Sequence, residues 1–211
     1  MGRPKANSVF FKTWSSDMAY VLGFIATDGC LTQHKNGYNG LNITNKDKNI
    51  LKYILGAMRS NHKIGAKARG GSKDKKYFQI QIRDKIIYED LLKLGLTPRK
   101  SKTIRMPDVL PELFGDFIRG CLDGDGTVVV WQDPRWKHAW QMSVRFFSGS
   151  KNFLIDIQQR LHKEFGLTTG SIQRSRRSYA LCYSIADCVK LYRLLYKKPL
   201  YNLLFLWRKW H

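Results

Sequence analysis

The sequence of 211 residues has few acidic side chains and lacks the patterns that define membrane-spanning or secreted proteins. It carries 16 Asp and Glu residues against 37 Lys and Arg, a formal net charge of +21. No apolar run approaches the roughly 18 residues that a membrane-spanning helix needs. No basic-then-apolar signal peptide opens the sequence. We therefore expect an intracellular protein with no membrane partner.

The sequence also lacks the spacings of a zinc site. It has no C-x-x-C pair, no Cys/His cluster with zinc spacing and no H-E-x-x-H. The five histidines are scattered, and we expect no catalytic role for them. The four cysteines are expected to be buried, reduced thiols; they are Cys30, Cys121, Cys182 and Cys188.

What the chain does have is a core and a large positive charge. Apolar residues make up 43% of it, which excludes wholesale disorder. Charge repulsion on this scale opposes compaction, so a polyanionic partner is the natural explanation. Nucleic acid is the first candidate partner; an anionic membrane surface ranks second and is not retained as a partner.

Two apolar, small-residue-rich segments, 21–29 and 118–126, each reach an Asp-Gly pair. Their acids, Asp28 and Asp125, lie 97 residues apart (125 − 28), nearly half the chain. Each segment predicts a helix that stops at Gly and places a carboxylate at its C-terminal end. Two such helices, packed about a pseudo-twofold axis, would bring two carboxylates together. In so basic a chain this indicates metal-dependent cleavage of nucleic acid.

The small residues in these segments predict how the two helices meet. Gly23 and Thr27 lie four residues apart, as do Gly120 and Gly124, so each pair shares one helix face. Small side chains on facing surfaces allow the two backbones to approach closely. The C-terminal ends of both helices are then expected to lie side by side.

Hydrophobic periodicity predicts alternating helices and hairpins along the chain. Strand residues Leu41 and Ile43 are expected to face the core, with Asn42 and Thr44 on the opposite face. Helices are predicted over 15–27, 45–59, 84–94, about 111–125, 151–165, 187–196 and 201–210, and strands over about 41–44, within 63–83, over 127–132 and 139–147, and in a hairpin turning at 174–178.

The second half repeats the element order of the first. Lys48-Asn49 matches Lys151-Asn152, and Ile82-x-Asp84 matches Ile185-x-Asp187, both at an offset of 103 residues (151 − 48 and 185 − 82). This register indicates an internal duplication. The Pro-bearing connector at 103–111 separates two predicted halves, 1–105 and 106–211.

Segment 117–126, with its looser counterpart around Asp28, resembles the sequence motif of the LAGLIDADG homing endonucleases. Segments 94–102, 147–151 and 206–210 also look like that family. The resemblance implies an α+β fold of two pseudo-symmetric α-β-β-α-β-β-α halves, whose antiparallel sheets form a DNA-binding saddle. It also implies a monomer with pseudo-twofold symmetry, free-standing or intron-encoded and active in intron homing.

The chemistry expected at the motifs is hydrolysis of DNA with a divalent metal. Carboxylates at the negative end of a helix are unfavourable unless a cation binds there. Mg²⁺ or Mn²⁺ is therefore expected on Asp28 and Asp125, with Thr27 and Gly124 as further ligands. Ca²⁺ is expected to bind without supporting cleavage.

The resemblance assigns four more residues to catalysis. Lys100 matches a position where the family often has an active-site base, and Lys209 looks like its repeat counterpart. Asn45 matches a polar strand-end position that contacts metal-bound water, and Ser148 is its smaller equivalent in the second half. This difference leaves open an enzyme that cuts only one strand. Asp123, opposite Ala26, is expected to cap or pack.

The polar strand faces are the expected DNA-reading surfaces. Gln can bond adenine twice and Arg can bond guanine twice, whereas Lys/Arg-rich turns at 67–76 and 174–177 suit phosphates and predict salt-dependent binding. The residues assigned to DNA are Asn42, Thr44, Gln79, Gln81, Arg83, Gln141, Ser143, Arg145, Ser171, Gln173, Arg174 and Arg176.

The leading hypothesis is therefore a monomeric, site-specific endonuclease that cuts both strands of a long asymmetric DNA target. One alternative is a non-cleaving nucleic-acid binder of the same fold, either an intron maturase or a transcription regulator. Another is a basic RNA-binding protein in which the doubled Asp-Gly is a coincidence. It predicts RNA binding without metal dependence.

Overall fold

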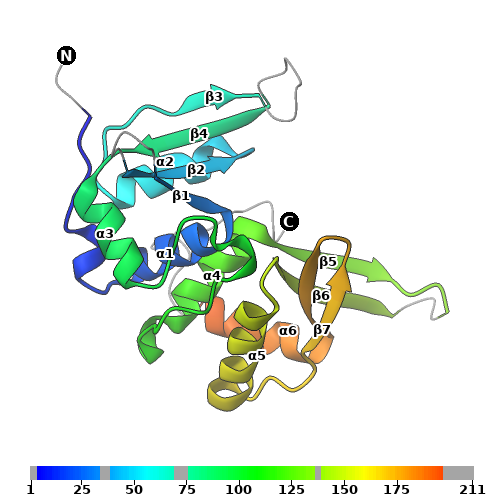
Figure 1. Ribbon diagram of the computed structural model, residues 1–211. Helices are drawn as coiled ribbons and strands as arrows, with labels where there is room; N and C mark the ends of the chain where they lie inside the picture. The colour runs from blue at the N-terminus through cyan, green and yellow to red at the C-terminus, as the bar shows by residue number, and fades with distance from the viewer. Residues whose placement is uncertain (1–3, 34–38, 69–75, 136–138, 197–211) are drawn as a thin grey trace.

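The computed structural model describes residues 4–33, 39–68, 76–135 and 139–196 as two halves with the same element order (Figure 1). A short 3-10 helix, Phe10–Lys12, comes first. The elements of the N-terminal half are α1 (Ser16–Asp28), β1 (Gly29–Gln33), β2 (Asn39–Asn45), α2 (Lys48–Ala57), β3 (Gly65–Lys67), β4 (Tyr77–Ile82) and α3 (Lys85–Lys93).

Two 3-10 turns, Lys100–Lys102 and Pro111–Leu113, lead into the C-terminal half. Its helices and strands are α4 (Phe114–Asp125), β5 (Gly126–Gln132), β6 (Trp140–Ser148), α5 (Lys151–Phe165), β7 (Ser171–Ser175), β8 (Ser178–Tyr183) and α6 (Ile185–Leu195). The predicted last helix, 201–210, lies outside the described residues.

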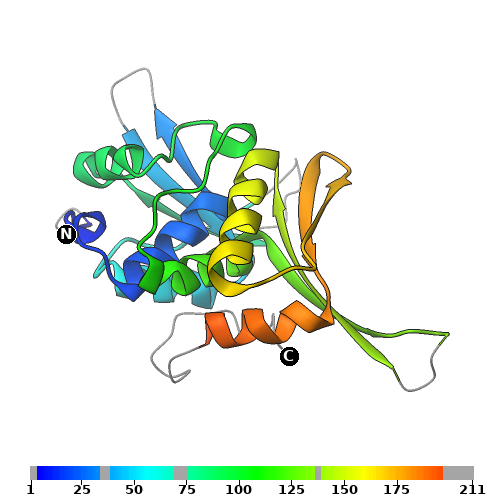
Figure 2. The same cartoon turned by 90° about the horizontal axis from the view of Figure 1, so that it is seen from below.

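Each half contributes one four-stranded antiparallel sheet, ordered β1-β2-β4-β3 and β5-β6-β8-β7. Helices α2 and α3 pack on the first sheet, and α5 and α6 pack on the second. The β5–β6 hairpin extends well beyond the helices that cover the second sheet (Figure 2). The predicted α+β fold of two similar halves is confirmed.

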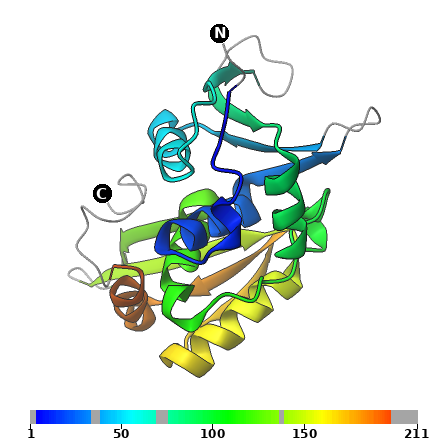
Figure 3. The same cartoon turned by 90° about the vertical axis from the view of Figure 1, so that its left-hand side faces the viewer.

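Helices α1 and α4 lie between the two sheets and join the halves (Figures 1 and 3). A Cβ added to Gly23 would lie 2.1 Å from the carbonyl oxygen of Phe117. One added to Gly120 would lie 2.0 Å from that of Tyr20. Both distances are far shorter than any real Cβ contact, so only glycine fits. The predicted close approach of the two backbones is confirmed.

Capping side chains set where several helices begin. The Ser15 hydroxyl accepts a hydrogen bond from Met18 N–H at 3.1 Å, and Asp84 accepts from the first turn of α3. Asp47 caps α2 through Asn49 N–H at 2.8 Å. The prediction that this helix begins at Asn45 was wrong, because Asn45 is the last residue of β2.

Strand alternation separates a core face from an open face in the first sheet. Leu41, Ile43, Ile80 and Ile82 are buried, as expected. Their neighbours on the opposite face are half-buried or exposed; they are Thr32, Asn42, Thr44, Gln79 and Gln81. In the second sheet the buried residues of the core face include Val144, Phe146, Leu181 and Tyr183.

The internal repeat is real, but one of its predicted correspondences was wrong. Lys48 and Lys151 both begin helices, α2 and α5. Ile82, however, lies in β4 whereas Ile185 begins α6. Strand pairing instead makes Ile82 equivalent to Tyr183, since each lies opposite a matching residue of the neighbouring strand.

The connector between the halves packs on α5. Ser150 donates a hydrogen bond to Ile104 O at 2.8 Å, and Asp156 accepts two from the Arg105 guanidinium. The division at residues 105 and 106 stays a prediction.

The four cysteines are free thiols. Cys121 and Cys188 are buried and Cys182 is half-buried, but Cys30 is exposed, against the expectation of buried thiols. Across the described parts of the chain, no helix combines the length and the apolar character needed to cross a membrane.

Candidate active site

Asp28 and Asp125 are the last residues of α1 and α4, where both helices end at a glycine. The final turns of the two helices touch, since a Cβ on Gly124 would lie 2.0 Å from Thr27 Oγ1. The structure therefore brings both predicted acids to the same end of one helix pair. Asp28 is half-buried, whereas Asp125 is exposed.

Asn45 holds Asp28. Its side-chain Nδ2 donates to Asp28 Oδ2 at 2.8 Å, while its Oδ1 accepts from Asp47 N–H at 2.9 Å. Because one amide oxygen and one amide nitrogen each have a suitable partner, the orientation of the amide is fixed. Asn45 is itself buried at the end of β2. The resemblance placed Asn45 near the metal water; in the structure it contacts the carboxylate directly.

Ser148 takes the equivalent place at the end of β6. Its hydroxyl accepts a hydrogen bond from Ser150 N–H at 3.1 Å, so it orders the start of α5. The side chain is shorter than that of Asn45 and carries no amide. The two carboxylates thus have different neighbours in the two halves.

Lys100 is buried, with 5% of its surface exposed. Its Nζ donates to the carbonyl oxygens of Ala26 and Gly29, both at 2.8 Å. A cation on the last carbonyls of α1 offsets the negative end of the helix dipole. Burial lowers the pKa of Lys100 to about 8, partly countered by nearby acids that include Asp28 and Asp125. Its repeat counterpart, Lys209, lies outside the described residues.

Thr27 and Gly124, the predicted backbone ligands, lie where α1 and α4 meet. The Thr27 hydroxyl donates to Phe24 O at 3.1 Å, which directs it to its own helix. In the parts of the chain that the structure describes, no three His, Cys, Asp or Glu side chains form a metal-binding group. The oxygen atoms at this end include the two carboxylates and the backbone carbonyls of the last helical turns.

Asp123 packs inside the helix pair, away from solvent. It is fully buried and accepts a hydrogen bond from the Tyr20 hydroxyl of the opposite helix at 2.8 Å. Burial, followed by the Asp123 charge, raises the pKa of Tyr20 well above its ordinary value. The expectation that Asp123 is a packing residue agrees with this contact.

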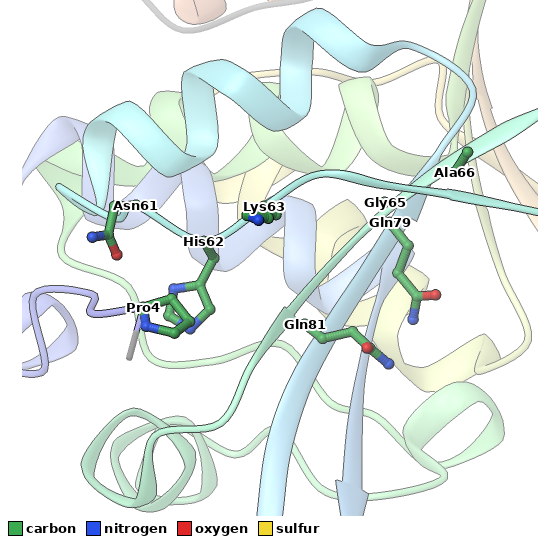
Figure 4. Close-up of a pocket in the computed structure, with 8 residues that line it drawn as sticks. All are labelled: Pro4, Asn61, His62, Lys63, Gly65, Ala66, Gln79 and Gln81. Carbon is green, nitrogen blue, oxygen red and sulfur yellow. The ribbon is translucent and has the colours of Figure 1, made fainter. Parts of the chain in front are cut away.

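The predicted DNA-reading residues of the N-terminal half share the open face of the first sheet. Asn42 donates to Thr32 Oγ1 at 3.3 Å and accepts from Gln79 Nε2 at 3.5 Å, which links three strands. Gln79 and Gln81 lie on the same side of β4 and line one pocket (Figure 4). Arg83 is exposed just beyond the end of β4.

Most of the predicted residues of the C-terminal half also share one face. Alternation places Gln141, Ser143, Arg145, Ser171 and Gln173 together on the open face. Ser143 is buried there and accepts a hydrogen bond from Arg145 Nε at 3.4 Å.

Two predicted residues lie elsewhere in the C-terminal half. Arg174, opposite Tyr179, belongs to the other face of the sheet, although it is exposed. Arg176 lies in the β7–β8 turn with a positive φ of 47°. Their DNA contacts, like those of the open-face residues, stay predictions.

Sequence reasoning missed several open-face residues. Cys30 pairs with Asn42, and Cys182 pairs with Arg145. Four further open-face residues could have been found from the alternation of buried and open positions along β5 and β6. They are Thr127, Val129, Trp131 and Phe147.

Comparison with solved structures places this geometry among known folds. A mesophilic variant of the homing endonuclease I-DmoI superimposes with a TM-score of 0.58 at 17% identity, covering 88% of this chain and 97% of that one. The homing endonuclease I-WcaI, bound to its DNA recognition sequence, gives a TM-score of 0.62 at 14% identity, covering 95% and 88%. The likeness is one of fold.

The N-terminal LAGLIDADG domain of DUF199/WhiA is similar as well, with a TM-score of 0.56 at 14% identity over 93% of this chain and 90% of that one. The chain therefore has the two-domain LAGLIDADG fold. No family profile and no curated protein matches the sequence.

Proposed function

We propose that this protein is a site-specific endonuclease that cuts both strands of DNA with a divalent metal. The observation that carries the proposal is the position of Asp28 and Asp125, which end two helices packed through glycines. Among solved structures of this fold, I-WcaI is bound to its recognition sequence and I-DmoI is in complex with DNA and manganese. The net charge of +21 suits the same class of partner.

The donors at the helix ends fit Mg²⁺ or Mn²⁺. Both acids stand at the negative end of a helix, where a carboxylate is unfavourable unless a cation binds. Asp28 and Asp125 would hold the ion, with the Thr27 and Gly124 carbonyl oxygens as further donors. A divalent cation bound there neutralises charge at the scissile phosphate and activates water at neutral pH.

Other residues of the protein orient these carboxylates and set the charge around them. Asn45 directs Asp28 through its 2.8 Å hydrogen bond, and Asp47 N–H fixes Asn45 in turn. Lys100 donates hydrogen bonds to Ala26 O in the last turn of α1 and to Gly29 O just beyond it, and brings a positive charge near both acids. A charge in this place favours the approach of a phosphate group.

The two open sheet faces would form a saddle on double-stranded DNA. Side chains on these faces would contact base edges, and basic side chains at their margins would contact phosphates. Both halves belong to one chain, so the protein is proposed to act as a monomer on an asymmetric target. Host gene and target sequence are left to experiment.

The test is cleavage of a library of randomised DNA sites with Mg²⁺. Recovery of one long target, cut on both strands, is the expected result. Ca²⁺ in place of Mg²⁺ should give binding without cleavage, as should the Asp28→Asn/Asp125→Asn variant. Asp108→Asn makes the same kind of replacement at a single exposed position of the connector and should cut normally. Full cleavage by the double variant would refute the proposal.

A second candidate is a binder of the same fold that does not cut, such as an intron maturase or a transcription regulator. The observation in its favour is Ser148, which replaces the amide that holds Asp28 in the first half. Binding in the library without cleavage would select it. Intron RNA would then be the next substrate to try.

A further inference from the structure

The backbone contact between α1 and α4 is the same when seen from either helix. A Cβ on Gly23 would meet the Phe117 carbonyl oxygen of α4. One on Gly120 would meet the Tyr20 carbonyl oxygen of α1. The two glycines lie 97 residues apart (120 − 23), and so do the two residues that they meet (117 − 20). The helices therefore meet about a pseudo-twofold axis, and each has the backbone shape needed to pair with a copy of itself.

The side chains break this symmetry at one buried pair. The Tyr20 hydroxyl of α1 donates a hydrogen bond to Asp123 Oδ2 of α4 at 2.8 Å, and both residues are fully buried. At the same offset of 97 residues, the equivalent positions hold Phe117 and Ala26. These two residues are also buried, but their side chains have no hydrogen-bonding group. The interface thus has a polar pair on one side of the axis and an apolar pair on the other.

Arg119 of α4 adds to the difference between the helices. Its guanidinium carbon lies 5.3 Å from the centre of the Tyr20 ring, and the same guanidinium donates to Asp116 Oδ1 at 2.7 Å. In α1 the equivalent positions hold Leu22 and Ala19. The charged groups around the Tyr20 ring therefore come from α4, and α1 has apolar residues in their place.

Pairing of like helices would break the buried hydrogen bond. If α1 packed against α1 of a second copy, the Tyr20 hydroxyl would face Ala26 and lose its acceptor. If α4 packed against α4 of a second copy, the Asp123 carboxylate would face Phe117 and lose its donor. A buried polar group that loses its partner is costly, whereas one apolar contact replaces another with little loss. The polar pair thus penalises both symmetric pairings and leaves the mixed pairing intact.

We propose that Tyr20 and Asp123 determine which helices pair, so that α1 binds α4 and two copies of the chain do not join through α1–α1 or α4–α4 pairs. A buried polar residue can fix the partner and the register of a helical interface, at a cost in stability. Each helix pair then carries one Asp28 and one Asp125. The inference concerns assembly and does not depend on the proposed function, because none of its tests uses DNA.

The first test makes the two helices alike by removing the polar pair. Tyr20→Phe/Asp123→Ala gives α1 and α4 the same residues at both positions. The full chain is unfolded in urea and refolded at a series of protein concentrations, and its mass is measured by light scattering after size exclusion. The variant should form dimers at a concentration at least about tenfold lower than the wild type does. A double variant that stays as monomeric as the wild type would overturn the inference.

Ile118→Val is the matched control for this variant. It trims a buried side chain of α4 but keeps the polar pair. It should lose some stability and stay monomeric. Dimers of this control at the same concentration as the double variant would mean that lost stability, and not the lost polar pair, allows the copies to join.

The second test makes the helices alike by repeating the polar pair. Phe117→Tyr/Ala26→Asp gives both helices a tyrosine and a carboxylate, so that like helices can also bond each other. This variant should dimerise as well. A polar pair that only added stability would instead make it a more stable monomer, and that result would overturn the inference.

A cysteine identifies which helices have paired. Thr27 lies beside Gly124 in the α1–α4 pair, and these two positions are equivalent (124 − 27 = 97). Two Thr27 residues would therefore lie side by side only in an α1–α1 pair. Thr27→Cys with Cys30→Ser, added to the first double variant, should give an interchain disulfide on non-reducing electrophoresis. Dimers without this disulfide would arise from a simple exchange of halves and would contradict the proposal.

Discussion

Asp28 and Asp125 end equivalent helices, yet the two halves surround them with different side chains. Asp28 is half-buried and held by Asn45 at 2.8 Å. Asp125 is exposed, and the residue equivalent to Asn45 is Ser148, which bonds the next helix. The shared framework depends on glycines that allow only one packing, whereas the side chains around each acid vary within that framework. Strict packing and variable chemistry thus occur in the same helix pair.

The most severe test of the comparison replaces each acid separately. Asp28→Asn and Asp125→Asn should each abolish double-strand cleavage, because each removes a carboxylate that the proposed metal needs. DNA binding should survive in both. Separately labelled strands would show whether one variant still nicks. Full double-strand cleavage by either variant would mean that its acid is not required.

The interface between α1 and α4 should not tolerate an added side-chain atom at its glycines. Gly120→Ala would place a Cβ 2.0 Å from the Tyr20 carbonyl oxygen of α1. We expect the free energy of unfolding to fall by about 3 kcal/mol. Thermal unfolding followed by circular dichroism measures this.

Gly56→Ala is the matched control for this variant. Gly56 also lies in a helix, but a Cβ there would meet nothing within 4 Å. Alanine should stabilise the protein by up to about 1 kcal/mol, since it favours helix more than glycine does. A similar loss of stability in both variants would show that the α1–α4 contact is not special.

Asn45 and Ser148 test whether the asymmetry around the acids matters. Asn45→Ala should reduce cleavage about 10- to 100-fold, the usual effect of losing a group that orients a metal ligand. Ser148→Ala should change cleavage little, because its hydrogen bond serves the start of α5. Single-turnover cleavage rates at saturating Mg²⁺ provide the comparison. Equal losses in the two variants would make the halves functionally alike.

Lys100 gives a smaller and pH-dependent effect. Lys100→Met leaves Ala26 O and Gly29 O without its hydrogen bonds and should cost about 1–3 kcal/mol. The pKa of Lys100 is about 8 in the folded protein against 10.5 as its ordinary value. Between these values the unfolded chain binds more protons, so wild-type stability rises with pH relative to the variant.

Urea unfolding of both proteins at about pH 7 and about pH 9.5 measures this gap. The wild type should exceed the variant by more at the higher pH. A gap that narrows instead would mean that Lys100 is not buried as a charged group.

Much of the fold was predictable because its signals are local. Gly23, Gly120 and Gly124 predicted a close helix contact. The alternation through Leu41 and Ile43 predicted a sheet with one buried face. The order of helices and strands followed from the same periodicities. The position of both acids at one end of the helix pair followed from their place at the ends of the motifs.

What depended on long-range contacts was not predictable in the same way. Nothing in the sequence shows that Lys100 bonds carbonyls more than 70 residues away. Two results depend on strand register, which a shift of one or two residues changes. They are the burial of Ser143 and the equivalence of Ile82 with Tyr183 in the repeat. Exposed Cys30 likewise follows from its strand partner and not from its residue type.

The α1–α4 contact also bears on when the proposed active site can form during synthesis. One acid belongs to each helix, and 96 residues of chain separate Asp28 from Asp125. A nascent chain that has emerged only through α3 holds a single carboxylate and half a DNA-binding surface. The proposed cleavage would therefore require that the second half has been synthesised and has docked on the first.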